Sequence, residues 1–430
     1  MKFNKWTVGL AAIGVVSLAS AARADEKMSQ VQTALSNTTL SGYVDTAAIW
    51  RPGSDLKNPA ALPAAPNIPA QAFSKNDGFY LNAVDLALDH PEDESPWAAG
   101  YHAEVMFGAD SVPGAIAFGA GGTGTGAAAT SAGSIRQAYV TLRTPVGNGL
   151  DWKIGVWDTI VGYESNSDPL NPNYTRSYGY SIEPTTHTGI LATYKVSDAV
   201  TVQAGVADDS NVAGAPVGIN GVSVIESQKA YMGDVQFTAP DSAGFMKGAT
   251  VTLAAITYAG NSTQNGAGAT PGGDGSTSWY VGATVPTPIT ALKVGSCFDY
   301  LSLHNGDTTG GGHNDNVWNL AAYASYQATE KLAFNARGEY LNTEGLTAAD
   351  AGGIFGGNTS AATIAAGGYN GNKVYEMTLT AQYNLWANVI SRLELRWDHA
   401  DTGLPFGADN TGAPFRSSDW MLALNVIYQF

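Results

Sequence analysis

Apolar and polar residues alternate along most of the chain, in segments of about ten residues. In the clearest segment one face would carry Trp97, Ala99, Tyr101, Ala103, Val105 and Phe107, and the other face Ala98, Gly100, His102, Glu104 and Met106. Alternation with a period of two is typical of a β-strand, whose successive side chains point to opposite faces. The pattern recurs up to the last residue and predicts about sixteen strands.

The predicted strands are separated by connections that are alternately short and long. We expect strands at 40–50, 79–89, 97–107, 135–143, 150–158, 188–196, 200–208, 229–238, 249–259, 278–285, 292–301, 317–328, 332–342, 374–385, 389–399 and from 419 to the C-terminus. The long connections follow the odd-numbered strands, at 52–75, 108–133, 159–187, 209–227, 260–277, 304–315, 343–372 and 401–417. A soluble β-sandwich, the main alternative, gives no reason for this alternation.

Short turns on one rim and long loops on the other are typical of outer-membrane barrels. The fold class that we predict is therefore all-β: a transmembrane, antiparallel, up-and-down β-barrel of about 16 strands, with short periplasmic turns and long extracellular loops. Strands of about ten residues suit a tilted crossing of the hydrocarbon core. About sixteen strands would enclose an aqueous channel, whereas eight would be filled by side chains.

The composition agrees with a barrel that faces lipid. Hydrophobic residues make up 44% of the 430 residues but charged residues only 13%, against about 25% charged residues in a typical soluble domain. No interior stretch of about 20 apolar residues exists, which argues against helical membrane spans. A barrel explains both observations, because lumen and loop residues dilute its apolar outer face.

The two ends of the chain carry signals for export and assembly. Lys2 and Lys5 precede an apolar stretch at 6–18, and Ala22-Arg23-Ala24 fits the cleavage pattern of a signal peptide. We therefore expect a signal peptide at 1–24, a short periplasmic N-terminal segment at 25–37 and a transmembrane β-barrel at 38–430. The last strand ends on Phe430, which resembles the terminal signature that the barrel-assembly machinery reads.

Charge and rare residues narrow the chemistry. The net charge of −16 argues against nucleic acid as a partner. Cys297 is the only cysteine, so an intramolecular disulfide and a cysteine-based metal site are excluded. The six histidines form no pattern that names a nucleophile or a metal site. We expect that the protein is not an enzyme and binds no cofactor or metal. The alternative for the loop from Asn305 to Asp315 is that its polar residues bind a cation instead of only forming a turn.

The third long loop is the candidate pore constriction. It is polar and aromatic, unlike the loops rich in Gly and Ala, and it contains Glu164, Asp168, Arg176 and Glu183. In general porins the loop after the fifth strand folds inward and narrows the pore. We expect its acids to oppose a basic wall formed by Arg337, Arg392 and Arg396, in a transverse field that sorts small polar solutes.

Strand phase selects the lumen-facing charges of that wall. Leu393, Leu395 and Trp397 would face lipid, so the intervening charges should face inward, because an arginine in the middle of the lipid face costs about 2–4 kcal/mol. The candidate lumen residues on the strands are Arg337, Glu339, Arg392, Glu394, Arg396, Asp398, Lys153 and Lys293. The alternative is that these charges pair with one another and only solvate the wall. Arg136 shares the phase of apolar residues, so we expect it at a rim or after a bulge.

Residues 135–208 resemble a known family. The segments IRQAYVTLRTPVG, WKIGVWDTIVGYES and NPNYTRSYGYSIEPTTHTGILATYKV are similar to the OmpL-like β-barrel porin family (β-barrel porin 2) of Gram-negative bacteria. The resemblance implies a passive porin of the outer membrane, through which small hydrophilic solutes and ions diffuse. Its partners would be outer-membrane lipid and lipopolysaccharide, with a homotrimer as an open question. The alternative function is a structural or adhesive outer-membrane barrel with a blocked lumen.

Overall fold

The structure is a computed structural model. It describes residues 37–52, 75, 77–111, 116–117, 133–208, 229–259, 275–305, 313–346, 373–402, 406 and 416–430. The expected signal peptide and nearly all of the expected N-terminal segment lie outside the described residues, as do large parts of the long loops.

Seventeen strands are described. They are β1 (Thr39–Trp50), β2 (Gly78–His90), β3 (Ala99–Phe107), β4 (Ile116–Ala117), β5 (Ser134–Thr144), β6 (Leu150–Asp158), β7 (Thr186–Ser197), β8 (Val200–Ala207), β9 (Ala230–Thr238), β10 (Thr250–Ala259), β11 (Gly275–Pro286), β12 (Leu292–Asn305), β13 (His313–Gln327), β14 (Leu332–Gly345), β15 (Lys373–Trp386), β16 (Val389–Ala400) and β17 (Ser418–Gln429). β4 is a two-residue strand that pairs only with the beginning of β5. The other sixteen strands confirm the predicted number.

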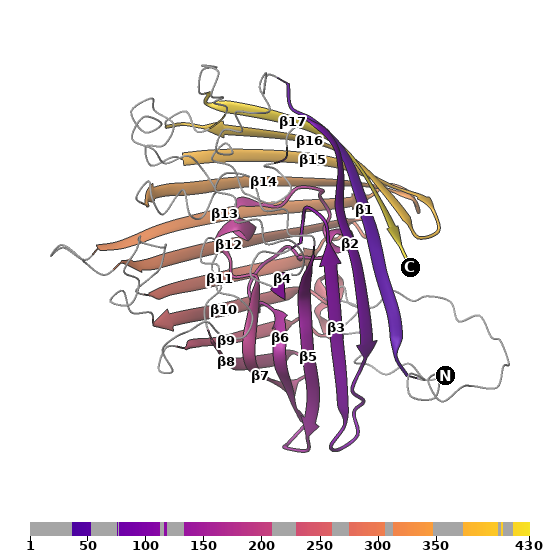
Figure 1. The fold of residues 1–430 in the computed structure, drawn as a ribbon, viewed down its shortest axis with the longest axis vertical. Coiled ribbons are helices and arrows are strands. Elements are labelled where there is room, and N and C mark those ends of the chain that lie inside the picture. Colours follow the sequence, from indigo (N-terminus) through magenta and orange to yellow (C-terminus); the bar gives the residue numbers. More distant parts are fainter. Residues whose placement is uncertain are drawn as a thin grey trace.

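These sixteen strands form a closed antiparallel barrel, in which each strand pairs with its neighbours in the chain (Figure 1). The barrel closes where β1 pairs with β17, from Tyr43 opposite Gln429 to Trp50 opposite Leu422. The terminal Phe430 exchanges two backbone hydrogen bonds with Gly42, of 3.0 and 3.1 Å. Closure leaves no unpaired strand edge in the lipid, where an unsatisfied backbone group costs several kcal/mol.

The connections alternate as predicted. Short turns such as 198–199, 328–331 and 387–388 occupy one rim, together with the start of β1 and the C-terminus. Asn388 has φ 66°, the left-handed conformation that two-residue hairpin turns favour. The long connections occupy the other rim, which is therefore the extracellular one.

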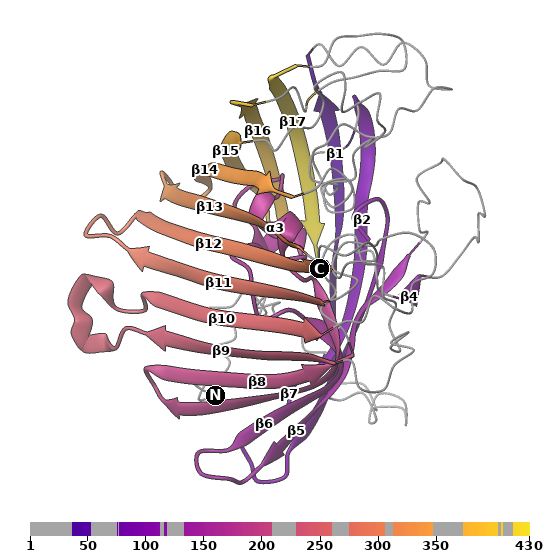
Figure 2. The ribbon, with the colours of Figure 1, turned by 90° about the vertical axis from the view of Figure 1, so that its left-hand side faces the viewer.

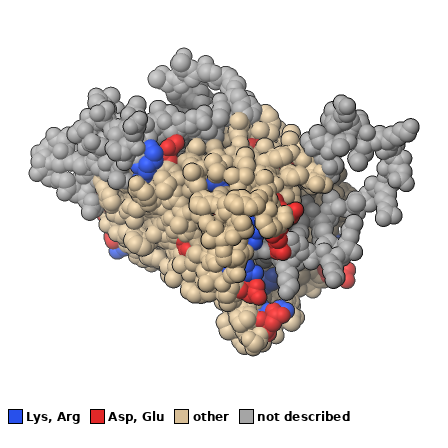
Figure 3. All heavy atoms as spheres, turned by 90° about the horizontal axis from the view of Figure 1, so that it is seen from below, with Lys and Arg blue, Asp and Glu red and all other residues tan. Residues whose placement is uncertain are grey.

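The outer surface of the barrel is apolar and carries aromatic belts. Most of the described surface in the view of Figure 3 is neither acidic nor basic. Near the extracellular rim, the Tyr340 ring lies 5.2 Å from that of Trp318 and 5.0 Å from that of Tyr375, and Trp397 lies 5.9 Å from Trp420. Aromatic rings at this height mark the boundary of the hydrocarbon core.

Two local departures from regular strands have physical causes. Arg136 has no partner in the register between β3 and β5, where Glu104 lies opposite Gln137 and Val105 opposite Ile135. This bulge confirms the expectation from its phase, and it turns the Arg136 side chain into the lumen. The third strand begins at Ala99 instead of the predicted residue 97, because Trp97 has φ 64° and cannot continue a strand.

Helices are few and short in the described part of the chain. They are α3 (Tyr178–Ile182) and the 3₁₀ turns η1 (Asp168–Leu170) and η2 (Asp241–Met246). No helix among these residues has the length and apolar character needed to cross a bilayer.

The inside–outside alternation of the strands is open to a direct test. Leu395 lies near the middle of β16 with 42% of its surface exposed on the outer face. Replacing Leu395 with Arg should lower the free energy of unfolding by about 2–4 kcal/mol, because a guanidinium is then placed in hydrocarbon. Urea unfolding in lipid vesicles measures this change. The matched control is Gln203→Arg on the lumen face of β8, for which we expect little change; equal losses for the two variants would contradict the assigned faces.

Candidate functional site

The connection between β6 and β7, residues 159–185, lies inside the barrel and is called the inner loop from here on. Its helix α3 contacts the inner side of β12, β13 and β14, as Figure 2 shows. Tyr174, Arg176 and Tyr178 are all buried. The expectation that the third long loop folds inward is thus confirmed.

The wall arginines hold the backbone of the inner loop. Arg396 Nη1 donates a 2.7 Å hydrogen bond to the carbonyl of Arg176, and Arg392 Nη2 donates one of 2.5 Å to that of Asn171. Arg337 Nη1 donates to the carbonyl of Thr175 at 2.7 Å. Three guanidinium groups on β14 and β16 therefore satisfy carbonyl groups that have no strand partner in the lumen.

The wall carboxylates do the same for the amides of the inner loop. Glu394 on β16 accepts hydrogen bonds from the backbone N–H groups of Tyr174 (2.6 Å) and Thr175 (2.9 Å). Glu339 on β14 accepts one from the N–H of Tyr178 at 2.8 Å. The Asp398 carboxylate accepts a 2.7 Å bond from the Tyr178 hydroxyl. Basic and acidic side chains of the wall thus form a cradle that fits the carbonyl and amide groups of the loop.

Arg337 is the centre of this cradle. Its side chain is fully buried and forms ion pairs with Glu164 of the inner loop (2.8 Å), Glu339 (3.1 Å) and Glu376 on β15 (3.3 Å). A buried charge is tolerated only when ion pairs and hydrogen bonds replace its hydration. The guanidinium therefore ties the loop to two strands at once.

Apolar packing accompanies the ionic contacts. At the extracellular end of the wall, Leu301, Val317, Leu341 and Met421 point inward and pack with Tyr178 and other residues of the inner loop in one buried cluster. Barrel interiors are usually polar. This part of the lumen is packed like the core of a soluble protein, so the loop is held over a large area.

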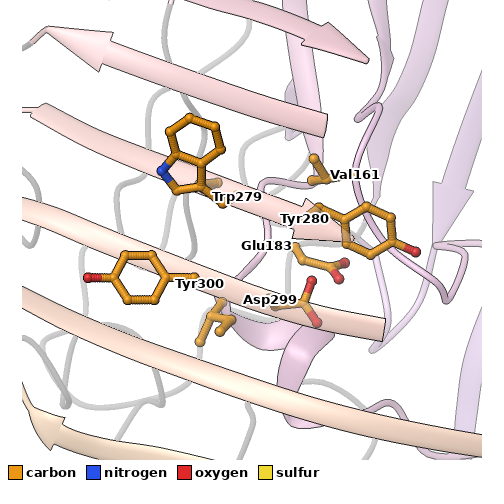
Figure 4. A pocket seen from close by; sticks show the side chains of 8 residues that line it. Val161, Glu183, Trp279, Tyr280, Asp299 and Tyr300 are labelled. Atoms are coloured by element: carbon orange, nitrogen blue, oxygen red, sulfur yellow. The ribbon is translucent and has the colours of Figure 1, made fainter. Parts of the chain in front are cut away.

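The predicted opposition of loop acids and wall arginines holds for only part of the set. The Asp168 carboxylate forms its ion pair with Arg176 of the same loop at 2.6 Å, and Arg392 on the wall donates a hydrogen bond to the Asp168 carbonyl at 3.2 Å. Glu183 faces the carboxylate of Asp299 on β12 instead of an arginine (Figure 4). Only the predicted opposition of Glu164 and Arg337 is confirmed, and as a direct ion pair. Strand phase gives the face of a residue but not its height in the barrel, which explains why the partner of Glu183 was not predicted.

The two lysines lie away from the cradle. Lys153 on β6 points into the lumen, with its ammonium group 4.5 Å from the centre of the Tyr139 ring. Lys293 lies on the inward phase of β12 but near its periplasmic end, where it is exposed. Inward-facing polar side chains on the strands that follow Lys153 remain partly exposed, among them Thr193, Gln203, Gln236 and Thr252.

Several residues of the site were missed in the sequence. Glu376 and Thr380 on β15 share the inward phase with Val374, so the same phase rule that selected β14 and β16 could have found them. Asn335 donates a 2.8 Å hydrogen bond to the carbonyl of Pro172, and nothing in the sequence indicates this partner. Within the described ranges, no three His, Cys, Asp or Glu side chains are grouped as a metal ion would require.

A closed barrel of sixteen long strands, with an apolar exterior and a loop held inside, defines the class of outer-membrane channels. A search of solved structures supports this fold. The outer membrane channel DcaP of Acinetobacter baumannii has a TM-score of 0.56 at 11% identity, over 91% of this chain and 97% of that one. An anion-selective porin from Comamonas acidovorans has 0.54 at 12%, over 91% and 99%, and OmpF of Salmonella typhi has 0.55 at 12%, over 91% and 97%.

The sequence itself places the chain in a family. Residues 37–430 match the family described as "Putative beta-barrel porin-2, OmpL-like". The chain belongs to this family and is an outer-membrane porin of a Gram-negative bacterium. A search of curated proteins finds no match.

The role of Arg337 can be measured as stability. Arg337→Ala should lower the free energy of unfolding by about 3–5 kcal/mol, because Glu164, Glu339 and Glu376 then lose the buried cation that they share. The midpoint of urea unfolding, followed by tryptophan fluorescence, reports this loss. Lys293→Ala removes an exposed cation from the same lumen and should leave the midpoint unchanged. An unchanged midpoint for Arg337→Ala would show that the cradle does not hold the loop.

Proposed function

We propose that the protein is a water-filled channel for passive diffusion of small hydrophilic solutes and ions, and that the inner loop narrows it from one side. The observation that carries this proposal is the position of the loop. It is fixed by Arg337, Arg392 and Arg396 to the wall of β14–β16. Partly exposed polar side chains face the lumen on β6–β10.

In this proposal, the charges of the cradle position the constriction instead of lining it. Arg337, Arg392, Glu394, Arg396 and Asp398 are buried beneath the loop, so solutes do not touch them. Glu339 and the inner-loop residues Glu164, Asp168, Arg176 and Glu183 are buried as well. Ion selectivity then depends on lumen charges outside the cradle, foremost Lys153, with a smaller contribution from Lys293 at the periplasmic rim.

We further propose the partners and processing that a porin of this kind would have. They are a cleaved signal peptide at 1–24, recognition of the strand ending in Phe430 by the assembly machinery, contact with lipopolysaccharide, and a homotrimer. A trimer form is stated for OmpT of Vibrio cholerae, whose fold matches at a TM-score of 0.53 and 12% identity over 91% of this chain and 99% of that one.

Planar-bilayer recording of the mature protein tests the channel. We expect discrete ohmic conductance steps. Lys153→Glu should move the reversal potential in a salt gradient toward that of a more cation-selective pore, because the substitution reverses a lumen charge. Lys293→Glu, at the wide rim, should move it less. A correctly folded, heat-modifiable barrel without conductance steps would instead favour the alternative of a structural or adhesive protein with a blocked lumen.

A further inference from the structure

The C-terminal limb of the inner loop ends in a pair of buried carboxyl groups. Glu183 lies three residues before the first residue of β7, and only 6% of its surface is exposed. Its carboxyl group lies beside that of Asp299 on β12, close enough for a hydrogen bond when one of the two is protonated. Figure 4 shows the two side chains next to each other, one from the loop and one from the wall. Two carboxylates can form a hydrogen bond only when one of them carries a proton.

The surroundings of this pair are acidic. Like Asp299, the charges of Glu164 in the inner loop and Glu339 on β14 raise the pKa of Glu183. Arg337, on the same wall, is engaged by Glu164, Glu339 and Glu376. From β11 and β12 the pair meets Ser278, Tyr280 and Cys297, which are uncharged in their ordinary forms. A second negative charge at this position would have no compensating cation among these neighbours.

The pair fits closely against its surroundings. Gly162 of the inner loop has φ 110°, and a Cβ atom there would lie 2.5 Å from Glu183 Oε2. A cavity of about 10 Å³, which is room for one water molecule, is lined by Glu183, Asp299 and Ser278. Ser278 Oγ and Asp299 Oδ1 are buried there without a hydrogen-bond partner.

We propose that Glu183 and Asp299 are positioning residues of the channel: they hold the inner loop against β12 by sharing one proton, and loss of this proton as the pH rises releases that end of the loop. Burial, and then the charge of Asp299, raise the pKa of Glu183 well above its usual value. The attached loop therefore binds more protons than the released loop. Attachment weakens as the pH rises from the ordinary pKa of a glutamate, about 4.3, toward the raised value, and it is lost above that value.

The single cysteine of the chain reports on the attachment. Cys297 Sγ lies 3.6 Å from Asp299 Oδ2, and only 3% of the residue is exposed. Release of the loop should expose this thiol to the lumen. The experiment measures the rate at which a small methanethiosulfonate reagent labels Cys297 in the folded barrel, from pH 5 to pH 10. Each rate is divided by that of the unfolded protein, which removes the effect of thiol ionisation.

We expect the normalised rate to rise at least tenfold on the alkaline side in the unchanged protein. Glu183→Gln should abolish the rise, because an amide donates its hydrogen bond to Asp299 at every pH. Asp234→Asn, which removes a lumen-facing acid on β9, three strands from Asp299, should behave like the unchanged protein. A rate independent of pH, or an equal rise in Glu183→Gln, would overturn the proposal. So would exposure of Cys297 by EDTA at neutral pH, since a metal ion would then hold the pair.

The consequence for transport rests on the proposed channel function and is tested separately. Single-channel conductance should increase over the same pH range in the unchanged protein but not in Glu183→Gln. A barrel that is labelled as expected but never conducts would disprove the channel and leave the attachment standing. A barrel that conducts, but in which the labelling rate of Cys297 does not change with pH, would disprove only the proposed attachment of the loop.

Discussion

The structure depends on hydrogen bonds between charged side chains of the barrel wall and peptide groups of the inner loop. A loop inside a barrel has no neighbouring strand, and each buried peptide group without a partner costs about 1–3 kcal/mol. Arg392 and Arg396 supply donors to its carbonyl groups, and Glu394 supplies an acceptor to its amides. The wall therefore takes the role that a sheet partner has elsewhere in the fold, and the path of the loop follows the positions of these charges.

The sequence predicted the faces of the strands well, because a one-residue error in phase would place charges in lipid. The alternation around Leu395 was sufficient to place Arg392, Glu394, Arg396 and Asp398 inside the barrel. The sequence could not predict which atom each charge meets. That depends on the tilt of the strands and on the path of the loop, and neither leaves a periodic pattern. Arg392 consequently meets a carbonyl of Asp168, and Glu183 meets Asp299, where side-chain charges of opposite sign had been expected.

Ionic and apolar contacts have different consequences for the inner loop. The cluster of Tyr178, Leu341 and Met421 removes apolar surface from water without a preferred direction. The contacts of Arg337 are directional and permit one arrangement of Glu164 and Thr175. Together these contacts fill the side of the lumen between the inner loop and the wall with tightly packed side chains. In the proposed channel this side of the lumen would therefore keep a fixed shape, and movements would be confined to parts of the loop that the cradle does not hold.

The pairing of β1 with β17 makes barrel formation an all-or-none event. Across this seam Asn425 Nδ2 donates a 2.5 Å hydrogen bond to Asp45 Oδ1, and the two residues are 380 positions apart in the chain. Bringing such distant segments together costs about 5 kcal/mol of chain entropy. Until the last strand is in place, both edges of the sheet are open and no water can satisfy them in lipid. A polypeptide that lacks its final strand therefore cannot close the barrel, because β1 then has no partner on one side.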